Sequence, residues 1–125
     1  MTTCALVNDA GDVLRFQEFD DQPPALHPNK GVQWVVVDAG APSAVIAAWR
    51  GKLLAENDAE QAKRLHPTDW VYIRKADTGA PVSVEVQEAR DAIRALHDER
   101  EAWINDPERA ADELVTMAGA PAWPV

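Results

Sequence analysis

The chain has 125 residues, of which 46% are apolar and 26% are charged, and its formal net charge is -9. These values are typical of a soluble globular protein with one domain or two small modules. The acidic balance and the lack of a basic cluster exclude a nucleic-acid-binding surface, because phosphate groups would be repelled. Cys4 is the single cysteine, which excludes an internal disulfide framework and a cysteine-cluster metal site.

The N-terminus has neither the basic flank nor the apolar core of a signal peptide. No apolar run approaches the roughly 20 residues that a membrane helix needs. We therefore expect a soluble protein that stays in a reducing cytoplasm and has no membrane partner.

Three short β-strands are predicted in residues 1–40, which we expect to form a small β module. Residues 5–7 and 13–19 are rich in β-forming side chains and flank an Asp- and Gly-bearing loop, a pattern typical of a β-hairpin. Residues 33–37 predict the third strand. Such an antiparallel sheet needs another element packed on its apolar face.

Residues 41–125 are expected to form a helical region with an extended C-terminal tail. Ser43 predicts the start of one short helix and Asp58 the start of another, which Pro67 should end.

A third short helix is expected from Thr68 or Asp69 to Gly79, because both end signals fit. Residues 69–76 include a β-rich run, so a strand is the alternative there.

The clearest element is a long amphipathic helix of some 20 residues that begins at Ser83. Its apolar side chains recur at helical spacing: Val86, Ala89, Ile93, Leu96 and Trp103. The fold class that follows is α+β, with a small N-terminal antiparallel sheet of three strands and a helical C-terminal region with one long amphipathic helix.

A last helix is expected to begin with Pro107 at its first position and to stop at Gly119. Its inward-facing residues should be Ala110, Leu114 and Met117. The tail of residues 120–125 cannot be helical, because its two prolines lack backbone donors and restrict their neighbours.

The triplet Asp77-Thr78-Gly79 resembles the catalytic triplet of retroviral-type aspartic proteases. That chemistry needs two carboxylates about 3 Å apart that share a proton, and the triplet there follows an apolar strand. Here Arg74, Lys75 and Ala76 precede it and a strongly helical segment follows. We interpret it as a helix exit with Gly79 in a left-handed cap.

Three histidines lie far apart in the sequence and in different contexts: His27, His66 and His97. Zinc sites more often contain a closely spaced pair, so we interpret these residues as surface or helix-cap histidines. The sequence also lacks a phosphate-binding glycine loop and a nucleophile elbow. We therefore predict no metal, no cofactor, no catalytic residue and no enzymatic activity. Cys4 is expected to be a small buried thiol in a strand.

Four of the five tryptophans lie on predicted apolar faces, where core packing is expected: Trp34, Trp49, Trp70 and Trp103. Trp123 stands instead in a Pro-flanked tail without a periodic face. There it either folds back onto the chain or docks on a partner.

The helical region also carries a series of short segments: Leu65-His66-Pro67-Thr68-Asp69-Trp70, Arg74-Lys75-Ala76-Asp77-Thr78-Gly79, Ala89-Arg90, Ile93-Arg94 and Trp123-Pro124. This series resembles the tail assembly chaperones of bacteriophages, which are often grouped with tail-fibre assembly proteins. The N-terminal module is similar to the small β module that commonly opens phage tail proteins. The resemblance covers most of the chain, and its motifs are structural rather than catalytic.

The resemblance implies a phage or prophage tail protein that binds a tail fibre or tail-tip protein non-covalently, as a tail assembly chaperone in the host cytoplasm. The alternative is a structural component retained in the virion tail as an adaptor between tail tip and fibre. Homo-oligomerisation is left open. The residues expected to bind the partner are, in order, Trp123, Pro124 and Val125, and then Trp70, Arg74 and Trp103.

Overall fold

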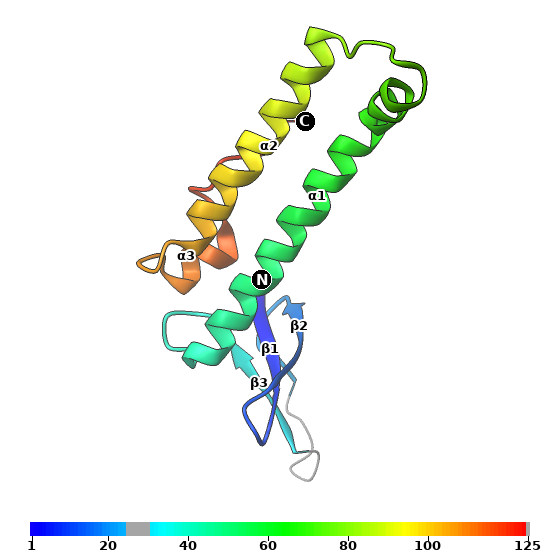
Figure 1. The fold of residues 1–125 in the computed structure, drawn as a ribbon. Coiled ribbons are helices and arrows are strands. Elements are labelled where there is room, and N and C mark those ends of the chain that lie inside the picture. The colour runs from blue at the N-terminus through cyan, green and yellow to red at the C-terminus, as the bar shows by residue number, and fades with distance from the viewer. Residues whose placement is uncertain (25–30, 125) are drawn as a thin grey trace. The chain divides into compact units, whose positions relative to one another are not determined.

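The computed structural model describes residues 1–24 and 31–124 (Figure 1). The expectations placed on His27 and Val125 fall outside these residues. The described residues form strands followed by helices, and the expected α+β class is confirmed.

Contacts divide the chain into two compact units. Unit 1 consists of Met1–Lys52 and Pro107–Gly119, and unit 2 consists of Leu53–Asp106 and Ala120–Val125. The division expected at residue 40 followed a change in composition, whereas these units follow contacts between segments that are distant in the sequence.

Unit 1 contains an antiparallel sheet with the strand order β2-β1-β3. Its strands are β1 (Thr2–Asn8), β2 (Val13–Phe19) and β3 (Val32–Val36). All three predicted strands are therefore confirmed. Ala5 on β1 lies opposite Phe16 on β2 and Val35 on β3, which places the three side chains on one face of the sheet.

The β1–β2 hairpin is closed by the side chain of Asn8. Its Oδ1 atom accepts hydrogen bonds from the backbone N–H groups of Ala10, at 3.0 Å, and Asp12, at 2.9 Å. Gly11 adopts a φ of 86°, a conformation that a side chain would strain. The Asp- and Gly-bearing loop thus forms the hairpin turn that the sequence predicts.

Trp49, on the first turns of helix α1 (Ser43–Thr78), is the central side chain of the unit 1 core. It is 7% exposed, and its ring meets the ring of Phe16 edge-on at a centroid distance of 4.9 Å. Its indole N–H donates a hydrogen bond of 3.1 Å to the carbonyl of Leu114 in helix α3 (Ala111–Thr116). Trp49 therefore joins β2, α1 and α3, and the core packing expected for it is confirmed.

The opposite face of the sheet carries a second aromatic contact. Trp34 packs edge-on against Phe19 at 5.0 Å, and the Arg15 guanidinium lies 5.4 Å from the Trp34 ring centroid. Trp34 is half-buried by these neighbours. Cys4 is fully buried in β1, as expected, and burial raises the pKa of its thiol.

Helix α1 is continuous over 36 residues, which overturns the expectation of three short helices in this stretch. Asp58 and Thr68 lie inside the helix and start no new one, and Pro67 does not end it. The helix favoured over a strand for residues 69–76 is confirmed.

Contacts with another helix explain why α1 continues past Pro67. An interior proline removes one backbone donor and costs a helix about 3 kcal/mol. Arg90 lies in α2 (Val84–Asn105) and donates a 2.9 Å hydrogen bond to the carbonyl of Leu65, in the turn that contains Pro67. Helices usually accommodate an interior proline by bending, and Figure 1 shows α1 bending near its C-terminal end.

Helix α2 begins where the sequence predicts. Ser83 is its N-cap, and the Ser83 hydroxyl accepts a hydrogen bond from the N–H of Val86 at 3.3 Å. Within unit 2, α2 runs antiparallel to the later part of α1, joined to it by residues 79–83 (Figure 1). Within the described ranges, no helix has both the length and the apolarity to span a membrane.

Helix α3 begins later than expected, because Pro107 lies in a turn before it. The N-cap is Ala110, whose N–H donates to the Glu113 carboxylate at 3.4 Å, so this contact marks the start of the helix. Ala110 is exposed rather than inward-facing.

The end of α3 also differs from the prediction. Met117 ends the helix in a left-handed conformation, with a φ of 54°, before the chain reaches Gly119. Leu114 is fully buried, as expected. Residues 120–124 belong to no helix, as the prolines require.

The Leu114→Ala substitution should lower the free energy of unfolding by about 3 kcal/mol, because it leaves a cavity in a fully buried site. Leu14→Ala is a matched control, since Leu14 is 54% exposed, and it should cost less than about 1 kcal/mol. Urea denaturation followed by tryptophan fluorescence measures both. Equal losses for the two variants would contradict the core position of Leu114.

Candidate functional site

The side of α2 that is buried in unit 2 is largely polar. Its buried residues are Arg90, His97 and Ile104, which recur every seven residues and so share one side of the helix. We call the contacts of Arg90 and His97 with α1 the α1–α2 seam. Of the apolar residues expected to share one face of this helix, Ala89 is exposed and the others are half-buried: Val86, Ile93, Leu96 and Trp103.

Arg90 makes the first set of seam contacts and is only 6% exposed. Its Nη1 atom donates to the Leu65 carbonyl at 2.9 Å, the Thr68 hydroxyl at 2.7 Å and the Asp69 carboxylate at 3.0 Å. The guanidinium also lies 4.8 Å from the ring centroid of Tyr72. Arg90 thus binds the turns of α1 on both sides of Pro67.

His97 makes the second set and is 7% exposed. Its Nε2 atom lies 2.7 Å from an Asp58 carboxylate oxygen on α1, and its Nδ1 atom lies 3.0 Å from an Asp98 carboxylate oxygen. Hydrogen bonds to Asp58 and then Asp98 raise the pKa of His97 above its ordinary value of 6.5, and they outweigh burial, which lowers it. The expectation of a surface or cap position is therefore wrong for His97.

A chain of hydrogen bonds continues from His97 toward the C-terminus. Asn57, which is 2% exposed, donates to the His97 carbonyl at 3.0 Å. Its side-chain oxygen accepts a 3.0 Å hydrogen bond from Arg100. Arg100 in turn donates to the carbonyl of Pro121, which connects the α1–α2 seam with the extended tail of residues 120–124.

Trp123 folds back onto unit 2, which is one of the two outcomes expected for it. The guanidinium groups of Arg64 and Arg100 lie 5.0 Å and 5.7 Å from its ring centroid. Arg64 also donates a 2.7 Å hydrogen bond to the carbonyl of Pro124. The tail is thus bound by two arginines, one from each long helix.

An apolar pocket of about 230 Å³ lies beside the folded-back tail. Its lining residues are Arg64, Ala89, Ala92, Ile93, Leu96, Trp123 and Pro124. Residues from α1, α2 and the tail therefore enclose a space large enough for an apolar side chain.

Trp70 lies near the end of α1, away from the folded-back tail. The expectation of core packing is wrong for it. It is 56% exposed, and Ile73, three residues on and hence on the same side of the helix, is 69% exposed. The Arg74 guanidinium lies 5.3 Å from the Trp70 ring centroid. We call Trp70, Ile73 and Arg74 the Trp70 surface. Arg90 contacts the ring of Tyr72, which belongs to the same stretch of α1, and not that of Trp70.

The residues expected to bind a partner therefore fall into separate parts of unit 2. Trp123 and Pro124 lie in the tail, Trp70 and Arg74 lie near the end of α1, and Trp103 is half-buried near the end of α2.

Asp77-Thr78-Gly79 forms a helix exit, as predicted. The N–H of Gly79 donates a 2.9 Å hydrogen bond to the Lys75 carbonyl, and its φ of 74° is left-handed. The Thr78 hydroxyl donates to the Arg74 carbonyl at 2.8 Å. Asp77 is exposed on the last turn of a helix and does not follow a strand.

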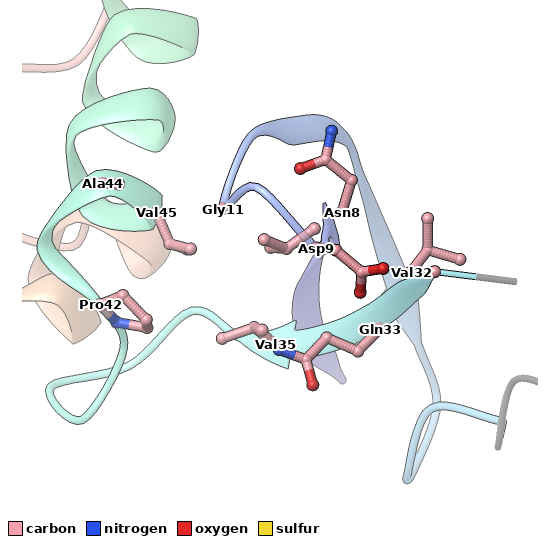
Figure 2. Close-up of a pocket in the computed structure, with 11 residues that line it drawn as sticks. Asn8, Asp9, Gly11, Val32, Gln33, Val35, Pro42, Ala44 and Val45 are labelled. Carbon is pink, nitrogen blue, oxygen red and sulfur yellow. The ribbon is translucent and has the colours of Figure 1, made fainter. Parts of the chain in front are cut away.

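Unit 1 contains a larger pocket, of about 490 Å³, between the β1–β2 hairpin, β3 and the start of α1 (Figure 2). Figure 2 shows Asn8 and Asp9 on one side of it and Pro42 and Val45 on the other. The polar groups of Asn8 are already engaged in the hairpin turn. The described lining residues include no charged pair or nucleophile of a kind that would define a reaction.

The two described histidines, His66 and His97, do not belong to one site. The side chain of His66 is 87% exposed, whereas His97 is buried. His97, Asp98 and Glu101 bring one possible donor atom each within 4.8 Å of one another. Because both ring nitrogens of His97 already contact carboxylates, we assign no cation site to this group.

Sequence reasoning missed the buried roles of Arg90 and His97. His97 was interpreted as a surface or helix-cap residue, and Arg90 was given no packing role, because charged residues are rarely buried without partners. The available signal was the interval of seven residues that relates them to Ile104. That interval places all three on one side of a helix, whatever their polarity.

Comparisons of this chain with protein-family models, with curated proteins and with solved structures found no match.

The Arg90→Met substitution should destabilise unit 2 by about 2 kcal/mol, because it removes charge-assisted hydrogen bonds from the turn around Pro67. Helix content measured by circular dichroism should fall with it. The Arg94 side chain is 52% exposed, so Arg94→Met is the control and should cost less than about 0.5 kcal/mol. An unchanged helix content and stability in Arg90→Met would contradict the role given to Arg90.

Proposed function

We propose that this chain is a phage or prophage tail protein that binds a tail fibre or another tail component non-covalently, as a tail assembly chaperone. The proposal begins from the resemblance of its short segments to that family. Exposed apolar side chains on unit 2 support a binding role, and the Trp70 surface is the observation on which the proposal rests.

The Trp70 surface has the composition of a protein-binding site. Trp70 and Ile73 stand side by side and largely in water, so a partner that covers them gains about 25 cal/mol for each Å² of apolar area buried. Tryptophan and arginine are also the residues most often found at the energetic centre of protein interfaces. Arg74 adds hydrogen-bond donors that suit a carboxylate of the partner.

The mechanism is the covering of apolar surface on an unassembled partner. Unassembled chains with exposed apolar segments aggregate, and a bound chaperone keeps them apart until the partner reaches its place. The folded-back tail and the apolar pocket beside it offer a second contact region. Arg64 and Arg100 both lie against the ring of Trp123 in the free chain, so a partner would compete with these arginines for the ring.

Replacement of Trp70 and Ile73 by Ala should weaken binding to the protein that copurifies with the tagged chain. Loss of an aromatic anchor typically costs 2 kcal/mol or more, so we expect an increase of about 30-fold in Kd by isothermal titration calorimetry. Leu14→Ala is the control, because Leu14 has an exposed fraction of 54% but belongs to unit 1. Equal affinities for both variants would show that the Trp70 surface does not bind this partner.

The tail is tested separately by truncation of residues 120–125. If the tail is the principal contact, truncation should abolish binding, whereas a principal contact at Trp70 predicts a smaller loss of about tenfold. Mass spectrometry of purified particles addresses the adaptor alternative. A stoichiometric copy in the particle favours an adaptor, and absence from the particle together with binding before assembly favours a chaperone.

A further inference from the structure

The surroundings of His97 in unit 2 favour the protonated form of its ring. Both ring nitrogens face carboxylate oxygens, Nε2 toward Asp58 at 2.7 Å and Nδ1 toward Asp98 at 3.0 Å. A neutral imidazole carries a single N–H, so it can donate to only one of the two carboxylates. In the neutral ring, one nitrogen lone pair would face a carboxylate oxygen at hydrogen-bond distance. The geometry therefore fits the imidazolium form.

We propose that His97 is a proton-dependent contact between α1 and α2, and that its proton controls how firmly the C-terminal tail is bound. This inference is independent of the proposed function, because it concerns the free chain.

The carboxylates around His97 act in the same direction. Asp58 faces it from α1, and Asp98 and Glu101 face it from α2, the last at 3.8 Å from Nδ1. The described tail residues 120–124 contain no titratable side chain. Hydrogen bonds to Asp58 and Asp98, together with the negative charges of Asp58 and Glu101, favour the protonated ring and raise the pKa of His97.

The backbone of His97 carries the effect to the tail. Its carbonyl accepts from Asn57, the residue next to Asp58, and Asn57 accepts from Arg100. Arg100 binds the Pro121 carbonyl and lies over the Trp123 ring. A shift of the His97 ring away from its carboxylates changes the position of this turn of α1 relative to α2. Arg100 bridges the two helices to the tail, so its contacts with the tail weaken as well.

The sign of the pH dependence follows from the raised pKa. A group whose pKa is higher in the folded state stabilises that state fully below its unfolded value, which is 6.5 for histidine. The stabilisation disappears as the pH rises through the folded-state pKa of His97. The tail should therefore be bound most firmly in mildly acidic solution and less firmly in alkaline solution.

NMR spectroscopy of the full chain tests the proposal. We expect His97 to titrate at a pH above 6.5, the ordinary value for histidine. The indole N–H peak of Trp123, assigned with Trp123→Phe, should shift with the His97 titration. Its heteronuclear NOE should fall as His97 loses its proton, because the ring becomes more mobile.

Two variants and a control complete the test. His97→Gln should remove the pH dependence of the Trp123 peak, whereas His66→Gln should leave it unchanged. Asp58→Asn changes an exposed carboxylate and serves as the second variant if His97→Gln does not fold, and it should lower the pH at which His97 titrates. The proposal is overturned if His97 titrates at or below the ordinary histidine value of 6.5, or if the Trp123 peak does not follow His97.

Discussion

The hydrogen bonding of Arg90 to the turn around Pro67 is the interaction on which the rest of unit 2 depends. An interior proline costs a helix about 3 kcal/mol, and each hydrogen bond from a charged donor contributes about 1.5–3 kcal/mol. The contacts of Arg90 with Leu65, Thr68 and Asp69 share the two hydrogens of Nη1, and hydrogen bonds from these two N–H groups are of the size needed to keep α1 continuous. Without this continuity, the helical turns that present Trp70 would have no fixed position.

Two different kinds of surface in unit 2 lie next to the α1–α2 seam. Beyond Pro67, α1 turns Tyr72 toward Arg90 and leaves Trp70 in water. Near His97, the seam connects through Asn57 and Arg100 with the tail. One surface is an open aromatic face and the other is a tail that must be released to expose its aromatic ring. In the proposed function, they would suit different stages of an encounter with a partner.

The features that could be predicted from the sequence are those that local signals decide. Ser83 starts α2 and Gly79 ends α1 because a cap and a left-handed glycine act within one turn. The continuity of α1 depends on Arg90, which is distant in the sequence, so the local signal at Pro67 was misleading.

The same reasoning applies to the candidate site. The exposure of Trp70 was missed because apolar residues at helical spacing usually mark a buried face. The burial of His97 was missed because its main partner, Asp58, lies in another helix. Trp49 was predicted correctly because its spacing with neighbouring apolar residues matches a simple packed face.

The seven-residue interval between Arg90 and His97 has a consequence for how the two helices find each other. Purely apolar helices can pair in several alignments that differ by one turn and bury similar areas. Here a shift of one turn would separate the buried Arg90 guanidinium from its acceptors on α1 and the buried His97 ring from Asp58, and loss of partners for buried charges is strongly unfavourable. The α1–α2 seam therefore selects one alignment of the two helices among several that would bury similar areas. This specificity costs some of the stability that an apolar contact could provide.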